Sequence, residues 1–235
     1  MIITPQFIFI HLHKTGGQFI GRAILDFIPG ARQYGYHYPL SMLPAEHQHK
    51  PVVGFVRNPW AWYVSWYAFN QTRPTVNPLY VVMSGQGQYD FQQTVRHLLS
   101  FGANDEASQQ RLAQLSKILP NSIEGNRGIG LTKMCLATAE GSFYQWQFQR
   151  MFETEKNDVS IYWGKTESLR EDFLAIMEQL NVSLPSRMRD YILSADKLNR
   201  SEHSDYQTYY DIALRADVAQ EEKKIIDQFH YQFDE

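Results

Sequence analysis

The chain has 235 residues, of which 43% are hydrophobic and 20% are charged, and its formal net charge is −3. This composition excludes an intrinsically disordered, collagen-like or coiled-coil protein. The charge balance argues against a general nucleic-acid binder, and no apolar run approaches the ~20 residues that a membrane-spanning helix requires.

The single cysteine, Cys135, cannot form an internal disulfide, which favours a reducing compartment. The first ten residues contain neither the basic region nor the cleavage site of a signal peptide, and they resemble a strand. We therefore expect a cytoplasmic protein, and a length of 235 residues predicts one domain covering 1–235.

The first predicted unit is a strand, a glycine turn and a helix. Residues 7–10 (Phe-Ile-Phe-Ile) lack polar alternation, as is typical of a strand covered on both faces. Apolar residues then recur at helical spacing from Phe19 to Phe27, and Pro29-Gly30 ends the predicted helix.

The pattern repeats further along the chain. Residues 52–56 predict a second buried strand, followed by Asn58 as the N-cap and Pro59 as the first residue of a helix. A third strand is predicted at 159–163, with a helix over 169–180. Strands that alternate with helices indicate an α/β domain with a three-layer, mostly parallel sheet.

Residues 71–141 are rich in Gln, Asn, Ser and Gly. We expect a helical insert here, with helices near 90–100 and 107–118 and loops at 73–88 and 119–130. Substrate specificity is expected to lie in this insert. The tail over 186–233 has a helical pattern with short breaks.

The first candidate site is the turn that follows residues 7–10. A strand, a glycine turn and a helix bring free backbone N–H groups to the positive end of the helix, where phosphate or sulfate binds. Gly16 and Gly17 allow close approach, Thr15 adds a hydroxyl and Lys14 adds a charge. The alternative is an ordinary turn with an exposed lysine. Lys14 precedes the glycines, which disfavours an NTPase loop of the Walker type.

Residues 11–17, His-Leu-His-Lys-Thr-Gly-Gly, resemble the 5′-phosphosulfate motif of sulfotransferases that use 3′-phosphoadenosine 5′-phosphosulfate (PAPS). The resemblance implies that Lys14, Thr15, Gly16, Gly17 and Gln18 bind the phosphosulfate. Two positions depart from the family pattern, because His13 stands at the usual Pro and Gln18 at the usual Thr or Ser.

Residues 56–67 are similar to the 3′-phosphate motif of the same family, with an arginine at a strand end, Asn-Pro, and a serine eight residues after the arginine. The resemblance implies that Arg57 and Ser65 bind the 3′-phosphate, for which a guanidinium offers a planar fork of donors. Alone, an arginine before a capped helix is more often structural. Two such motifs, in this order and on consecutive strands, are more specific.

Weaker likenesses extend over 163–169 and 198–206, and they imply Arg200 and Ser201 as further nucleotide contacts, with a solvated loop as the alternative. The resemblance implies a three-layer α/β fold like that of P-loop nucleoside triphosphate hydrolases, with the helical insert added. It also implies transfer of a sulfuryl group from PAPS to a hydroxyl of a carbohydrate or small metabolite.

In such a transfer Lys14 is expected to stabilise the leaving 5′-phosphate. His37 lies in a segment that resembles the one supplying the base in uronyl 2-O-sulfotransferases, and His13, His11 and Glu46 are the other candidate bases. An ATP-dependent kinase-like enzyme and a non-catalytic nucleotide-binding protein stay open.

No metal is expected. The pairs His11/His13 and His47/His49 have no further ligand of metal-site spacing, and Cys135 has no cysteine partner. The aromatic residues of 60–67 are expected to belong mostly to the core.

Overall fold

The computed structural model describes residues 1–72, 77–123, 130–153, 159–195 and 204–234. The chain divides into two compact units, one formed by residues 1–57 and 150–200 and the other by 58–149 and 201–235. The second unit contains the predicted insert, the preceding helix and the part of the tail from residue 201 onward. The single domain with an insert at 71–141 stays a prediction.

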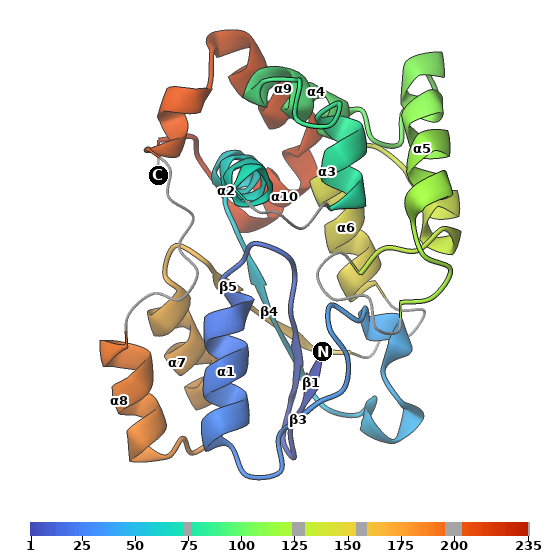
Figure 1. Ribbon diagram of the computed structural model, residues 1–235. Coiled ribbons are helices and arrows are strands. Elements are labelled where there is room, and N and C mark those ends of the chain that lie inside the picture. The colour runs from blue at the N-terminus through green and yellow to red at the C-terminus, as the bar shows by residue number, and fades with distance from the viewer. Residues whose placement is uncertain (73–76, 124–129, 154–158, 196–203, 235) are drawn as a thin grey trace. The chain divides into compact units, whose positions relative to one another are not determined.

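The first unit is built from five strands and three helices among its described residues (Figure 1). Its strands are β1 (Ile2–Ile3), β2 (Ile8–Ile10), β3 (Arg32–Gln33), β4 (Val52–Val56) and β5 (Ile161–Lys165). Its helices are α1 (Gly17–Phe27), α7 (Leu169–Gln179) and α8 (Ser186–Ser194), and two 3-10 turns cover Leu40–Met42 and Ala45–His47.

The strands form one mixed sheet in the order β3-β1-β2-β4-β5. Strands β2, β4 and β5 are parallel, whereas β1 pairs antiparallel with β2 and β3. The α/β class with flanking helices is confirmed, and the sheet departs from a fully parallel one at β1, which runs opposite to the other four strands. The cause is a tight turn, in which Thr4 N–H donates to Phe7 O and the Thr4 hydroxyl accepts from Phe7 N–H, because so short a link can join only antiparallel strands.

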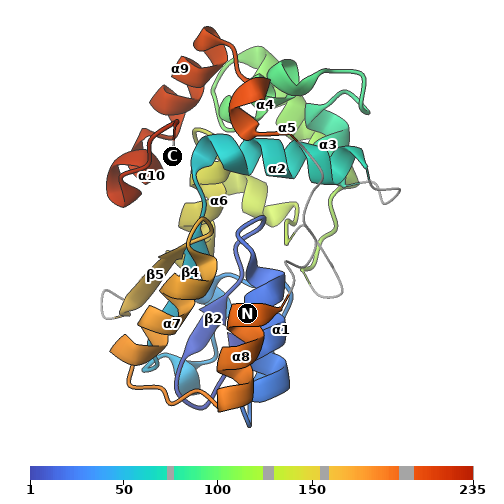
Figure 2. The same cartoon turned by 90° about the vertical axis from the view of Figure 1, so that its left-hand side faces the viewer.

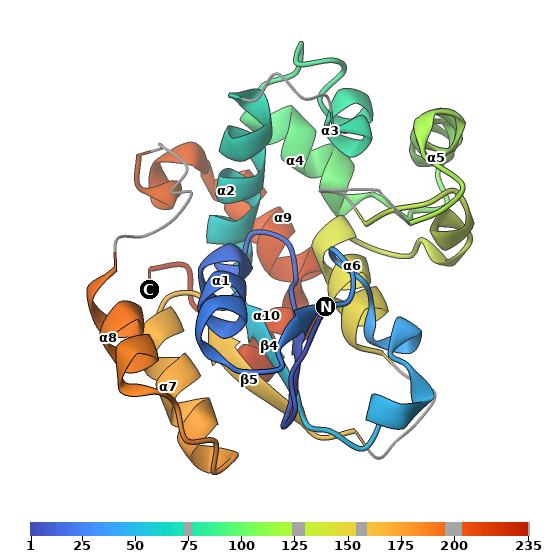
Figure 3. The same ribbon diagram turned by 60° about the horizontal axis from the view of Figure 1, so that its bottom comes forward.

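Helices α1, α7 and α8 pack against one face of the sheet. Figure 2 views the unit from the side of these helices, with the strands behind them. The segment 40–50 lies on the other side of the strands (Figure 3). The apolar stripe predicted for α1 is confirmed, since Phe19, Ile20, Ala23 and Ile24 are buried in the core with β-strand residues such as Phe9.

The described part of the second unit is helical. Its elements are α2 (Pro59–Gln71), α3 (Pro78–Met83), α4 (Phe91–Leu99), α5 (Glu106–Ile118), most of α6 (Phe143–Phe152), α9 (Ile212–Glu221) and α10 (Lys223–Phe229), with 3-10 turns at Met134–Thr138 and Tyr206–Tyr209. The predicted helices near 90–100 and 107–118 are confirmed as α4 and α5.

Helix α2 is the core of this unit. The Asn58 side chain accepts from the N–H groups of Trp60 and Ala61, and Pro59 occupies the first turn, so the predicted start is confirmed. The helix is buried on nearly every face rather than along one stripe, which is the pattern of a helix surrounded by others. Its aromatic side chains are buried except for the partly exposed Phe69, and Trp62 stacks on Tyr144 with ring centroids 4.5 Å apart.

Two helices depart from the sequence expectation. Helix α3 lies inside the predicted loop 73–88, and α6 was not predicted. A signal for α3 was present, because Asn77 caps it through Leu79 N–H and Pro78 follows, repeating the Asn-Pro pattern of α2.

No helix in the described residues is long and apolar enough to cross a membrane. The cytoplasmic location stays a prediction.

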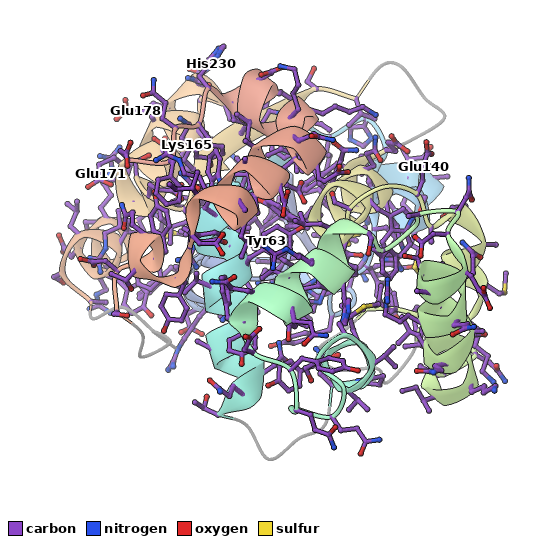
Figure 4. All side chains as sticks on the ribbon, turned by 90° about the horizontal axis from the view of Figure 1, so that it is seen from above. Tyr63, Glu140, Lys165, Glu171, Glu178 and His230 are labelled. Atoms are coloured by element: carbon purple, nitrogen blue, oxygen red, sulfur yellow. The ribbon has the colours of Figure 1, made fainter. Side chains whose placement is uncertain are left out.

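A buried carboxyl group lies at the centre of the second unit. Glu222 is fully buried, and its Oε1 accepts a 2.5 Å hydrogen bond from the hydroxyl of Tyr63, which Figure 4 labels among the helices. Its Oε2 has no hydrogen-bond partner among the described residues. Burial raises the pKa of Glu222 to about 7, because desolvation disfavours the carboxylate.

The raised pKa predicts a pH-dependent effect of Glu222→Gln. The unfolded carboxyl has its ordinary pKa of 4.5, so the folded protein loses stability as pH rises from 4.5 through about 7. The amide of the variant cannot ionise, and we expect the variant to gain stability over the parent, on the order of 3 kcal/mol at pH 8 and little at pH 4.5. Urea unfolding at both pH values measures this, with Glu221→Gln as the control. An equal effect at both pH values would contradict a neutral buried carboxyl.

Candidate functional site

Three motif segments meet at the carboxyl edge of the parallel strands, the usual ligand edge of an open α/β sheet. Strand β2 ends at Ile10, β4 at Val56 and β5 at Lys165. The N–H and the hydroxyl of Thr166 both donate to Val56 O at 2.8 Å. The segments after the three strands therefore lie together in the first unit.

The turn after β2 has an unusual backbone. Lys14 and Gly16 are left-handed, with φ of 62° and 73°. The buried Thr15 hydroxyl donates to Leu12 O at 2.9 Å, and this hydrogen bond stabilises the turn. The predicted contact of Thr15 with a ligand stays a prediction.

The turn leads into an N-terminus of α1 that no side chain caps. Gly16 is the N-cap without a side-chain hydrogen bond, and the first turn of the helix holds no acidic residue. The first N–H groups of a helix have no carbonyl partner within it and carry the positive end of its dipole. This end of α1 therefore has the chemistry of an anion site.

Gly16 and Gly17 are also required by packing behind the turn. A Cβ on Gly16 would lie 2.6 Å from Leu169 Cδ2, at the start of α7. A Cβ on Gly17 would lie 2.0 Å from His11 Cδ2. The sequence indicated glycine for ligand approach, but these side-chain contacts by themselves demand it.

Arg57 joins the two predicted motifs. It follows β4 directly, and its Nη1 donates to Lys14 O at 3.3 Å. Both side chains are half-buried, so two cations lie at the same edge as the positive end of α1. Such a concentration of positive charge attracts an anionic ligand.

The remaining residues predicted to bind a nucleotide are Gln18, Ser65, Arg200 and Ser201. Ser65 belongs to the second unit, where it is buried on α2. Arg200 and Ser201 lie outside the described residues. Gln18 is exposed in the first turn of α1. Their contacts with a nucleotide stay predictions.

Three imidazole rings gather beside the turn. The ring of His37 stacks on that of His13 with centroids 3.7 Å apart and lies 4.4 Å from that of His11. Nδ1 of His37 is 2.8 Å from His11 O. A carbonyl only accepts, so Nδ1 carries the proton and the neutral ring keeps its lone pair on Nε2.

Burial sets the charge of these rings. His37 is 6% exposed, and desolvation lowers its pKa to about 4, so it is neutral at pH 7. Desolvation and then the neighbouring charge on His37 lower the pKa of His11 well below its ordinary value. Because its ring fills the space beside Gly17, His11 fits a structural role better than that of a base. Glu46 is exposed on a 3-10 turn.

A cavity of about 510 Å³ lies between α1 and the segment 33–37. Its lining includes His37, His11 and Gln18, together with Arg22 and Tyr36, which the sequence analysis did not single out. Arg22 follows Gln18 by four residues and so shares its face of α1, a spacing that could have identified it.

No three His, Cys, Asp or Glu side chains within the described ranges form a group that could hold a metal ion.

No family model matches the chain. No curated protein matches it either. Among solved structures, the chain is similar to the mouse sulfotransferase SULT7A1 complexed with PAP, with 12% identity, a TM-score of 0.47, and coverage of 94% of this chain and 83% of the other. A likeness of this extent assigns neither a fold family nor a function.

The contact between Gly17 and His11 predicts a cost for Gly17→Ala. Alanine is the better helix former, yet its methyl group would overlap the imidazole, and we expect a net loss of about 1–3 kcal/mol. Thermal unfolding measures the loss. Gly21→Ala is the control on the same helix, where a Cβ would lie 3.2 Å from the flexible end of Ile2. Equal stability of the two variants would contradict the packing argument.

The burial of His37 predicts that its imidazole titrates at low pH. We expect its imidazole proton signals to titrate near pH 4 in an NMR series, well below the ordinary value of 6.5, because burial disfavours the cation. Nitrogen shifts should show the proton on Nδ1, held by His11 O. A midpoint near 6.5, or a proton on Nε2, is the contrary result.

Proposed function

We propose that the chain is a PAPS-dependent sulfotransferase that acts on a hydroxyl of a carbohydrate or small metabolite. The observation that carries this proposal is the hydrogen bond from Arg57 to Lys14 O, which joins the two anion-binding motifs at one edge of the sheet. A donor with a 5′-phosphosulfate and a 3′-phosphate needs two cationic points, and these two residues supply them.

The donor substrate would supply the sulfuryl group and leave as 3′-phosphoadenosine 5′-phosphate (PAP). An S–O bond forms to the acceptor oxygen while the S–O bond to the 5′-phosphate breaks, and negative charge passes to that phosphate. Lys14 and the N–H groups of Gly16 and Gly17 are the proposed stabilisers of this charge. In the same proposal Arg57 and Ser65 hold the 3′-phosphate, with Arg200 and Ser201 as further contacts.

His37 is the proposed general base. Its Nε2 lone pair accepts the hydroxyl proton of the acceptor, and the bond from Nδ1 to His11 O fixes the ring in the required tautomer. The cavity beside α1 is lined by His37 and Gln18, so the acceptor is proposed to enter there.

One observation favours nucleotide binding without transfer as a second candidate function. A pKa of about 4 makes His37 a weaker base than an ordinary imidazole. Kinase-like phosphoryl transfer has less support, because Lys14 precedes the glycines instead of following them.

Calorimetric titration with PAP, compared with ATP and AMP with and without Mg²⁺, tests the binding step. We expect selective binding of PAP that needs no metal. Arg57→Ala should weaken it by about 10- to 100-fold, the effect of losing a hydrogen bond to a charged group. Lys14→Gly should do the same, and glycine suits the left-handed backbone there. Arg32→Ala removes an exposed arginine of the same unit as the control.

Preference for ATP with Mg²⁺, or no nucleotide binding, would overturn the proposal. His37→Ala then separates transfer from binding, with release of PAP from PAPS measured over a panel of hydroxyl acceptors. A variant that binds PAP normally and has lost the transfer activity of the parent supports the base role. A parent that binds PAP but transfers to no acceptor would favour the binding-only function.

A further inference from the structure

A second cavity, of about 410 Å³, lies entirely within the second unit. Its walls come from α3, the turn after α3, α4 and α5, which Figures 1 and 3 show near one another. Nothing in the proposed transfer reaction uses these elements.

Helix α5 supplies one wall. Ala107, Gln110, Arg111 and Gln114 all line the cavity, and their spacing of three and four residues puts them on one face of the helix. This face is polar, with two amides and one cation, although it borders a cavity within a helical unit. A face of this kind is suited to a hydrogen-bonding ligand.

The turn after α3 supplies another wall, and backbone hydrogen bonds hold it. Gly85, Gln86 and Gly87 are consecutive left-handed residues, with φ of 56°, 60° and 84°. Gln86 N–H donates to Val81 O at 2.7 Å, and Tyr89 N–H donates to Ser84 O at 2.9 Å. The amide side chains of Gln86 and Gln88 and the ring of Tyr89 therefore line the cavity from a backbone fixed by its own hydrogen bonds.

Arg111 brings a positive charge to the lining of the cavity. Its Nη2 donates to Ser108 Oγ at 2.8 Å and Ser100 Oγ at 3.1 Å, two neutral partners. Its Nε is buried and has no hydrogen-bond partner among the described residues. Within those residues Arg111 forms no ion pair, and none of the residues lining the cavity is acidic.

Asp105 is an acidic residue that interacts with the charge of Arg111. However, Asp105 is engaged as the N-cap of α5, where its Oδ1 accepts from Ser108 N–H at 3.0 Å. A guanidinium with only neutral hydroxyl partners favours an anionic group of a ligand, because charged donors bind charged acceptors more strongly than neutral ones.

His97 adds a hydrogen-bond acceptor to the lining of the cavity. Its Nδ1 is 2.9 Å from Met83 O, so the proton lies on Nδ1 and Nε2 keeps the lone pair of a neutral ring. Burial lowers the pKa of His97, which preserves this neutral form at pH 7. The ring of Tyr89 meets that of His97 edge to face at 5.2 Å and offers an aromatic surface beside it.

We propose that this cavity binds a hydroxylated ligand carrying one anionic group, of the chemical class of a uronate or a sugar phosphate. Arg111 pairs with the anion, and the amides of Gln86, Gln88, Gln110 and Gln114 bind the hydroxyls through both donor and acceptor atoms. His97 Nε2 accepts from one further hydroxyl, and Tyr89 packs on the apolar face of the ring. The site is independent of the proposed transfer reaction.

Titrations of the full chain with glucuronate, glucose 6-phosphate, glucose and acetate test the proposal. We expect the two anionic sugars to bind. Glucose lacks the anionic group and acetate lacks the hydroxyls, so each should bind at least about 10-fold more weakly. The two anionic probes distinguish a carboxylate from a phosphate ligand.

Two variants locate the binding. Arg111→Gln should weaken the anionic sugars about 10- to 100-fold, while Arg96→Gln, an exposed arginine of α4 outside the cavity, should leave their affinity unchanged. Ala107→Phe fills the cavity from an exposed position of α5 without touching the charge, and it should also abolish binding. Circular dichroism confirms that each variant is folded.

Three results would overturn the proposal: no anionic sugar binding with a dissociation constant below about 10 mM, equal binding by the parent and Arg111→Gln, or equal binding of acetate and glucuronate. Titration of the Arg111→Gln variant with PAP distinguishes binding at this cavity from binding at the proposed PAPS site. If the variant loses sugar binding and keeps its affinity for PAP, the sugar binds at this cavity. If the parent does not bind PAP, the proposed function fails, and the sugar titrations still test this cavity.

Discussion

The close packing of His11 on Gly17 is the contact on which the candidate site depends. The His11 ring occupies the space that a side chain at 17 would need, and so fixes the start of α1 against the end of β2. The carbonyl of the same residue accepts from Nδ1 of His37 and sets its tautomer. One residue therefore determines both where the uncapped helix end lies and which nitrogen of His37 can accept a proton. A substitution at His11 removes only the ring contact with Gly17, because the carbonyl that holds His37 belongs to the backbone.

The positive character of this site comes from Lys14, Arg57 and the backbone, and not from His11 or His37. Burial keeps His37 neutral, and desolvation is also the largest cause that lowers the pKa of His11, to which the charge of Lys14 adds. The site therefore assigns two tasks to different groups, attraction of an anion to the cations and acceptance of a proton to His37. The cations attract an anion at any pH near neutrality, while His37 stays available as an acceptor.

Local signals in the sequence were sufficient for elements with caps and periodicity. The strand, glycine turn and helix at residues 7–27 and the Asn58 cap of α2 were predicted because short-range hydrogen bonds and burial on one face determine them. The antiparallel β1 follows from the tight turn at residues 4–7, which periodic runs of residues do not reveal. The division into two units depends on contacts between distant segments, which periodicity does not encode. The bond from Arg57 to Lys14 O likewise joins residues 43 positions apart, so proximity of the two motifs could be predicted but not their direct contact. The cavity around Arg111 had no motif at all.

The same physical effect gives the two units opposite responses to pH. Desolvation lowers the folded pKa of His37 to about 4, so its contribution to stability is complete above 6.5 and is lost as pH falls towards 4. Desolvation raises the folded pKa of Glu222 to about 7, so its contribution is complete below 4.5 and is lost as pH rises through 7. Each group is neutral where its unit is most stable. A fall in pH from 6.5 to 4 therefore weakens the unit that holds the anion site, through His37, whereas a rise in pH from 4.5 to 7 weakens the helical unit, through Glu222.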